Sequence, residues 1–237
     1  MMPQFTYSSS ELDALSEARN YYSWLVGQFA PFLGGHIIEV GAGVGTFSQY
    51  LLAAAPVRLL EAIEPAVNNA ERLSETFRND SRVEVHHGYL EGMELAGVAD
   101  AVVMVNVLEH IADDRAALSA AYQALRPGGH LLLFVPAVQA IYGSLDRAFE
   151  HYRRYERSGF RALVGEVGYD VRRLRYVNSF GVIAWYLSGR VFRRRSLDRH
   201  SVRLYDRLVV PWLFGCENVM PPFIGQSLLV VARRGER

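Results

Sequence analysis

The fold is decided by residues 36–46, which read HIIEVGAGVGT. Residues 36–40 are apolar and β-branched enough to form a short strand. Glycines follow at positions 41, 43 and 45, and the pattern after them predicts a helix over residues 45–55. Glycine lets the backbone come close to a ligand, and the first turn of a helix leaves N–H groups free to bind one. The stretch therefore predicts a strand, a tight turn and a helix, with a ligand at the turn.

Similar strand candidates recur along the chain, each separated from the next by a helical pattern. They are residues 36–40, 58–63, 82–86, 100–105 and 130–135. The fourth is apolar after Asp100, as expected for a strand that is covered on both faces. Short strands that alternate with helices favour an α/β fold with a doubly wound, mainly parallel sheet. Because ligands of such sheets bind at the carboxyl ends of the strands, we expect the chemistry in the loops that follow these strands.

The chain departs from simple alternation after the fifth strand. A helix at 156–167, a sixth strand near 170–177 and a last strand at 227–232 complete the predicted sheet. Almost fifty residues separate the last two strands, and a structureless loop of that length is improbable in a compact domain. We expect two helices there, forming a cap over residues 179–225. The chain then forms one domain, with an N-terminal helical lid (1–35), a core (36–178), the cap, and a last strand and tail (226–237).

The composition narrows the chemistry. Half of the 237 residues are apolar, which supplies a full core for one soluble domain. The single cysteine, Cys216, excludes a disulfide framework and fits a reducing compartment. Since neither a secretory signal nor a transmembrane run is visible, we expect a cytoplasmic protein. All 25 basic residues are arginines, which excludes Schiff-base and lysine-nucleophile chemistry.

The net charge of zero hides an asymmetry between the two halves of the chain. Residues 1–125 carry 6 arginines and 16 acidic residues, whereas residues 126–237 carry 19 and 9. The cap is rich in arginine and in aromatic residues, among them Phe192, Trp212 and Phe214. The basic half can face an anionic substrate, nucleic acid, or a lipid surface through those three aromatics. Its charges can also simply pair with the acidic half across the fold.

The glycine turn departs from the known phosphate-binding patterns. The dinucleotide fingerprint needs a glycine at position 46, which is Thr46, and no Gly-Lys-Ser/Thr sequence occurs. Glu39 stands just before the glycines, where a carboxylate opposes a pyrophosphate and suits a cationic ligand such as a sulfonium with an ammonium group. Glu64 ends the second strand, where a carboxylate can accept both hydroxyls of a ribose.

Four motifs, in order over residues 36–136, resemble the class I S-adenosylmethionine-dependent methyltransferases, in particular small-molecule enzymes of the type 11/12-like bacterial subgroup. The motifs are Glu39-x-Gly41-x-Gly43-x-Gly45, Glu64-Pro65, Asn106-Val-Leu-Glu-His110 and Arg126-Pro-Gly-Gly129. The resemblance implies S-adenosylmethionine as the cofactor. It also implies a Rossmann-like, seven-stranded sheet with helices on both faces, the cap being inserted before the last strand.

The resemblance further implies where the cofactor binds. The methionine part lies against the glycine loop, Glu39, Asn106 and Val107, and the ribose lies against Glu64 and Pro65. The adenine is flanked by Gly88, Tyr89 and Leu90.

Two aromatic residues, Tyr89 and Tyr21, belong to the expected cofactor site. The family commonly has an aspartate after the glycine that corresponds to Gly88, and here Tyr89 replaces it, so a stacked ring or a backbone contact takes the place of that polar contact. Near the N-terminus, Tyr21 is the candidate aromatic for the sulfonium. Since Tyr21 and Tyr22 differ by about 100° around a helix, only one of them can face the site.

A polar loop after the fifth strand contains the sequence HYRRY at residues 151–155 and resembles a subgroup of bacterial methyltransferases. The candidate catalytic residues are His110, His151 and Tyr152. A histidine suits the role of base because its ordinary pKa lies near neutrality. The loop can instead be a buried network that fixes the cap, with Asp146 paired to Arg153 or Arg154. No histidine and acidic residues have metal-ligand spacing, so no metal is expected.

We predict methyl transfer by in-line displacement to a small molecule held between the cap and residues 137–157. The aromatics of the cap suit an apolar or lipid-like acceptor, and its arginines suit an anionic one. Two alternatives stay open. One is a cyclase that turns the methionine chain on itself to give azetidine-2-carboxylate and methylthioadenosine. The other is a nucleic-acid or membrane-surface binding protein that uses the basic cap.

The sequence gives weaker indications of other partners. Nucleic acid is not expected, because acidic and apolar residues interrupt the arginines of the cap. Peripheral membrane contact stays open. Both a monomer and a homodimer are compatible with the sequence.

Overall fold

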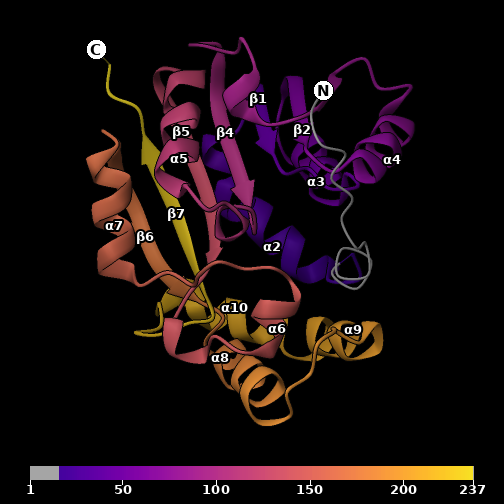
Figure 1. Ribbon diagram of the computed structural model, residues 1–237, viewed down its shortest axis with the longest axis vertical. Helices are drawn as coiled ribbons and strands as arrows, with labels where there is room; N and C mark the ends of the chain where they lie inside the picture. The colour runs from indigo at the N-terminus through magenta and orange to yellow at the C-terminus, as the bar shows by residue number, and fades with distance from the viewer. Residues whose placement is uncertain (1–15, 237) are drawn as a thin grey trace.

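A single seven-stranded sheet organises the computed structural model, which describes residues 16–236 (Figure 1). The strands are β1 (Gly35–Val40), β2 (Val57–Glu64), β3 (Val83–His87), β4 (Ala99–Val105), β5 (Leu125–Pro136), β6 (Asp170–Val177) and β7 (Ser227–Arg233). Their order is β3-β2-β1-β4-β5-β7-β6. Only β7 runs antiparallel to its neighbours, β5 and β6. The predicted α/β class and Rossmann-like seven-stranded sheet are confirmed.

Helices lie on both faces of this sheet and at one end of it. The α-helices are α2 (Arg19–Phe29), α3 (Thr46–Ala54), α4 (Val67–Phe77), α5 (Asp114–Ala124), α6 (Ser144–Ala148), α7 (Arg157–Glu166), α8 (Ser179–Tyr186), α9 (Arg199–Leu208) and α10 (Val210–Val219). Shorter turns are η1 (Ala30–Phe32), η2 (Leu90–Gly92), η3 (Leu108–His110), η4 (Gln139–Ile141) and the π turn η5 (Leu187–Val191). Residues 1–15 of the predicted N-terminal lid lie outside the described residues.

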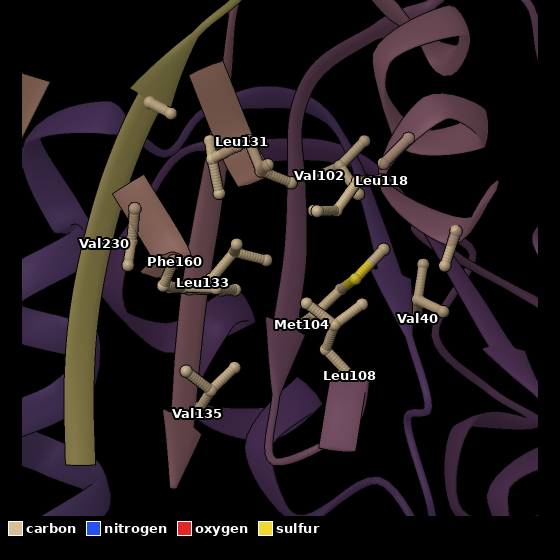
Figure 2. Packing of buried hydrophobic residues seen from close by; sticks show 14 of the residues in the cluster. Val40, Val102, Met104, Leu108, Leu118, Leu131, Leu133, Val135, Phe160 and Val230 are labelled. Atoms are coloured by element: carbon tan, nitrogen blue, oxygen red, sulfur yellow. The ribbon is translucent and has the colours of Figure 1, made fainter. Parts of the chain in front are cut away.

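The core lies on both sides of the central strand β4, because successive residues of a strand point to opposite faces. Val102 and Met104 point to the face covered by α5 and α7, where Figure 2 shows Leu118 in the same cluster. Ala101 and Val103 point to the face covered by α2 and α3. Burial of each large apolar side chain contributes about 1.5–3 kcal/mol. Two-sided burial explains why this strand is apolar, as predicted.

The cap between β6 and β7 contains three α-helices, not the two expected from the sequence. Pro211 lies in the first turn of α10 and separates it from α9, because proline lacks the N–H that would continue the helix. The buried carboxylate of Asp206 accepts hydrogen bonds from the backbone N–H groups of Asn20 (3.0 Å) and Tyr21 (2.9 Å). This contact joins α9 to the first turn of α2, so the cap is fixed to the sheet domain.

One aromatic residue of the cap was misplaced by the prediction. Phe214, expected on the surface with Phe192 and Trp212, is buried and stacks on Trp24 of α2 with ring centroids 3.8 Å apart. Phe192 and Trp212 are exposed as expected. Within residues 16–236, no helix has both the length and the apolar character needed to cross a membrane.

Candidate functional site

The glycine turn after β1 adopts a conformation that only glycine accepts readily. Gly41, Gly43 and Gly45 all have positive φ angles, of 71°, 59° and 87°. The N–H groups of Gly41 and Ala42 donate to the carbonyl of Ile63 at the end of β2, which ties the turn to the neighbouring strand. A Cβ atom on Gly41 would lie 2.5 Å from the side chain of Val107. The turn therefore brings its backbone close to the loop after β4 and leaves no room for a side chain.

Glu64 at the end of β2 is buried and held by the backbone around it. One oxygen accepts a hydrogen bond from Gly43 N (2.8 Å) and the other from Ala66 N (2.9 Å). Burial raises the pKa of Glu64, against the lowering effect of these hydrogen bonds. The amide of Asn69 also donates to the oxygen that Ala66 N–H contacts, at 3.5 Å, so the other oxygen keeps one lone pair for a hydroxyl group of a ligand. The ribose contact of Glu64 stays a prediction.

Glu39 is placed differently from the expectation. Its carboxyl lies on the α3 side of β1, where the hydroxyl of Ser48 donates to it at 2.5 Å. Burial raises the pKa of Glu39 to about 8, so the group is mostly protonated at neutral pH. Glu39 does not line either of the cavities described below, because alternation along β1 turns Val40, not Glu39, toward the larger one.

A cavity of about 760 Å³ opens at the carboxyl ends of β1, β2 and β4. Predicted site residues that line it are Gly41, Gly43, Glu64, Pro65, Gly88, Tyr89, Leu90, Asn106, Val107, His110, His151 and Tyr152. Met104, Ile111 and Ala117 give it an apolar wall near Leu90. Gly45 is absent from this lining, because its Cα faces Phe77 and Leu73 of α4.

Of the two adjacent tyrosines on α2, Tyr22 lines the larger cavity and Tyr21 does not. The Tyr21 ring packs edge-on against Phe134 and lies beside Phe214 of the cap, and its hydroxyl bonds the side chain of Asn106. Tertiary packing therefore places Tyr22 at the larger cavity, and not the predicted Tyr21.

A second cavity of about 310 Å³ lies under the cap. Its walls come from α2, from the loop after β5 and from the cap, with Tyr21, Leu145, Trp185, Val202 and Tyr205 among them. Asn106 and His151 line both cavities, so the two spaces adjoin at these residues. Asn106 has a positive φ of 53°, which brings this polar residue back over the end of β4.

His151 is held from one side by a buried carboxylate. Its Nδ1 lies 3.2 Å from Oδ1 of Asp146, which no solvent reaches. Asp146 also accepts from Arg154 Nε (2.6 Å) and from the indole N–H of Trp185 (3.0 Å). Burial would raise the pKa of Asp146, but these three partners together with Gly143 N–H lower it to about 2, so the group stays ionised. The carboxylate fixes Nδ1 as the protonated ring atom and leaves Nε2 with its lone pair.

The network interpretation of this loop is therefore also correct in part. Arg154 pairs with Asp146, whereas Arg153 pairs with Asp114 at the start of α5 (2.6 Å). Tyr152 is exposed in the larger cavity, and its backbone N–H donates to the carbonyl of Glu109. Polar density in this loop thus serves both the attachment of the cap and the cavity wall.

His110 lies against His151, with ring centroids 4.8 Å apart. Burial lowers the pKa of His110 to about 3, with a further contribution from the neighbouring His151. The imidazole is neutral at any physiological pH. Its weak basicity makes His110 a poor proton acceptor.

Glu109, His110 and His151 each place one potential ligand atom within 4.8 Å of the others. The sequence did not indicate this group, because His151 is separated from the other two by forty residues and only the fold brings them together. All three residues also line one or both of the two cavities, and this shared position explains why they lie close together without a metal ion.

The sequence did not single out some of the residues that line the larger cavity. Asn69 supports Glu64 from α4, and Tyr142, Arg147 and Glu150 complete the wall opposite the glycine turn. The last three fall in the polar loop 142–155, whose composition marked the segment but not the individual side chains.

The chain is similar in sequence and in fold to known methyltransferases. A family model described as a methyltransferase domain matches residues 14–174. A ubiquinone biosynthesis O-methyltransferase from Aromatoleum aromaticum is 28% identical over 148 residues, covering 61% of this chain and 58% of that protein. The chain thus spans just over half the length of this curated relative.

Solved structures show the same fold at low sequence identity. A phosphoethanolamine N-methyltransferase from Haemonchus contortus, bound to phosphomonomethylethanolamine and S-adenosylhomocysteine, has a TM-score of 0.66 at 16% identity over 97% of this chain and 58% of that one. An S-adenosylmethionine-dependent methyltransferase from Mesorhizobium loti has a TM-score of 0.63 at 14% identity, over 91% and 98%. The chain therefore belongs to the methyltransferase-domain family, and it shares its fold with the S-adenosylmethionine-dependent methyltransferase from Mesorhizobium loti.

Proposed function

We propose that this enzyme methylates a hydroxyl group of a small, largely apolar acceptor, with His151 as the base. The observation that carries the proposal is the position of His151, which lines both cavities while Asp146 holds its Nδ1. A donor and an acceptor bound in the two cavities would meet at this residue.

The residues of the larger cavity fit S-adenosylmethionine. The glycine turn offers close backbone approach and no room for a side chain, which suits the methionine part of the cofactor. Glu64 would accept a ribose hydroxyl with the free lone pair of its carboxylate, and Tyr89 and Leu90 would flank the adenine. Asn106 and Tyr22 would lie near the methionine end. The cofactor supplies an electrophilic methyl group on a positively charged sulfur that departs neutral.

The smaller cavity supports an apolar acceptor. Leu145, Trp185 and Val202 supply apolar walls, and Asn178 and Gln226 add polar groups at one side. A small number of polar groups in an apolar pocket is the usual way to orient a small ligand. Alignment of the acceptor and exclusion of water are the main contributions that such a site makes to methyl transfer.

His151 accounts for the proton that a hydroxyl acceptor must lose. Nε2 of His151 would take the proton of the acceptor hydroxyl when the oxygen of that hydroxyl receives the methyl group from the cofactor. Asp146 remains ionised and stabilises the imidazolium that results. His110, whose pKa lies near 3, is a much weaker base. Methylation of a hydroxyl also agrees with the O-methyltransferase name of the Aromatoleum aromaticum relative.

Product analysis tests the proposal. The protein is incubated with S-adenosylmethionine alone and then with a panel of phenols and catechols, and the nucleoside product is identified by mass spectrometry. We expect S-adenosylhomocysteine only when an acceptor is present. Methylthioadenosine formed without an acceptor would show cyclisation of the cofactor instead.

A pair of variants then tests the base. His151→Gln should lower kcat by about 10²-fold or more while the affinity for S-adenosylhomocysteine is kept, because general-base catalysis is worth that much. The matched control is His200→Gln on α9, which is exposed and lines neither cavity. Equal turnover of both variants would remove His151 from the reaction.

A chelator separates this chemistry from metal-assisted chemistry. The proposed base needs no metal ion, so we expect EDTA to leave turnover unchanged. A loss of turnover that a divalent cation restores would show a role for a metal ion, with Glu109, His110 and His151 as the candidate ligands at the cavity wall.

A further inference from the structure

The cap exposes an unusual amount of apolar surface. Of the sixteen large apolar side chains that are exposed within residues 16–236, thirteen belong to residues 179–225. They include Phe192 and Trp212, which are 65% and 80% exposed. Single exposed apolar residues are ordinary, but a concentration of them on one part of a surface marks an interaction site.

Helix α8 shows the pattern most clearly. Its sequence, SFGVIAWY, contains no charged residue, although the helix lies at the outer end of the molecule (Figure 1). Phe180 and Ile183 of α8 are followed by Leu187 and Val191 of the π turn η5, which continues the helix. The four residues are spaced three or four apart and are all exposed. Such spacing puts them on one side of the helix, so an apolar stripe faces outward where a polar face is normal.

The inner side of the same helix is occupied. Gly181, Trp185 and Ser188 line the smaller cavity, and the Trp185 indole N–H donates to Asp146. The outward stripe is therefore not the side that packs on the protein.

A cluster of arginines follows the stripe directly. Arg190, Arg193, Arg194 and Arg195 are all exposed, and residues 179–197 include no acidic residue. The last three form no ion pair with any residue that the structure describes. The segment thus combines an exposed apolar stripe with an uncompensated charge of one sign.

We infer that the cap docks on an anionic lipid surface, with the α8 stripe inserted at the headgroup level and the arginines on the phosphates. This combination of an apolar stripe and adjacent arginines is typical of helices that lie in a membrane interface. The inference does not depend on which acceptor the enzyme methylates.

Two other occupants fit the observations less well. Nucleic acid would use the arginines but not the apolar stripe. A second copy of the chain that contacts the same segment would cover the apolar stripe but would offer the arginines no acidic partner, because residues 179–197 contain none. A lipid surface uses both features together.

Vesicle co-sedimentation of the full chain tests the inference. We expect binding to mixed phosphatidylcholine–phosphatidylglycerol vesicles, and much weaker binding to pure phosphatidylcholine or at high salt. Ile183→Asp with Phe192→Asp should lower the partition coefficient by about tenfold or more, because apolar insertion is lost. The triple change of Arg193, Arg194 and Arg195 to Gln should weaken binding by a similar factor.

A matched control changes the same number of charges elsewhere. Arg78, which directly follows α4, Arg161 of α7 and Arg172 of β6 are exposed outside the cap, and their triple change to Gln should leave binding to the vesicles nearly unchanged. Circular dichroism and binding of S-adenosylhomocysteine confirm that each variant is folded.

Three results would overturn the inference. The first is no binding to anionic vesicles by the unmodified chain. The second is equal loss of binding in the cap and control triples, which would indicate an effect of net charge alone. The third is a dimer in light scattering that the Ile183→Asp, Phe192→Asp variant dissociates, which would assign the stripe to self-association.

Discussion

Nδ1 of His151 lies 3.2 Å from Oδ1 of Asp146, at the wall that the two cavities share. The same carboxylate accepts from Arg154 at 2.6 Å, so one buried group holds both the proposed base and the loop that carries it. Position of the base and stability of the loop are therefore coupled through Asp146.

The first prediction concerns this carboxylate. Asp146→Asn removes the charge that stabilises the imidazolium of His151, so kcat should fall by about 10²-fold or more while the affinity for S-adenosylhomocysteine changes little. The variant should also lose about 3–5 kcal/mol of unfolding free energy in urea titrations, because Arg154 is left buried without its partner.

Asp170→Asn is the control for the stability part. Asp170 pairs with Arg172 on the surface, both residues being more than half exposed, and such pairs contribute less than about 1 kcal/mol. If Asp146→Asn unfolds the protein no more easily than Asp170→Asn does, the Asp146 network does not hold the loop.

The second prediction contrasts two buried glutamates near the glycine turn. Glu64→Gln should weaken binding of S-adenosylhomocysteine by about 1–3 kcal/mol in calorimetry, because a charged acceptor for the ribose hydroxyls is lost. Glu39→Gln should leave the affinity within about twofold, less than 0.5 kcal/mol, because Glu39 faces Ser48 and not the cavity. Equal losses in the two variants would show that Glu39 also contacts the cofactor.

The sequence predicted those features that depend on local pattern. β4 was recognisable because an apolar run of that length is buried on both faces, and the turn after β1 because only glycine accepts its three positive φ angles. These properties are decided within a few residues, so the positions of the strands and the place of Glu64 at the end of β2 could be predicted.

Features that depend on distant packing could not be predicted in this way. The sequence analysis named Tyr21, but Tyr22 lines the larger cavity, because Phe134 and Phe214 hold the Tyr21 ring toward the cap. It placed Phe214 on the surface, since its cover is Trp24 from the other end of the chain. The smaller cavity lies where the sequence placed the acceptor, between the cap and the loop after β5, but its walls from α2 and from the end of β4 could not be predicted, because only the fold brings those segments together.

The third prediction compares two glycines that differ in their surroundings. Gly41→Ala would place Cβ 2.5 Å from the Val107 side chain at a φ of 71°, so we expect lower stability and weaker cofactor binding. Gly27→Ala lies within α2 with nothing within 4 Å of the new atom, and it should raise the unfolding free energy by about 0.5–1 kcal/mol. Thermal unfolding with and without S-adenosylhomocysteine measures both effects. A stabilised Gly41→Ala variant with full affinity would contradict the proposed close approach at the turn.

The fourth prediction concerns stability at acid pH. Burial lowers the pKa of His110 from 6.5 to about 3. Between these two pH values the unfolded chain binds a proton at His110 that the native protein does not, so the unfolding free energy falls as the pH drops through this range. The loss attributable to His110 can reach about 5 kcal/mol at the acid end. Urea titrations from pH 7 to pH 4 should therefore give a shallower dependence for His110→Gln than for the unmodified protein, whereas His200→Gln, on an exposed face of α9, should keep the original dependence. Parallel curves for all three proteins would mean that His110 titrates near its ordinary pKa of 6.5 in the native state as well, and His110 would then return as a candidate for proton transfer beside His151.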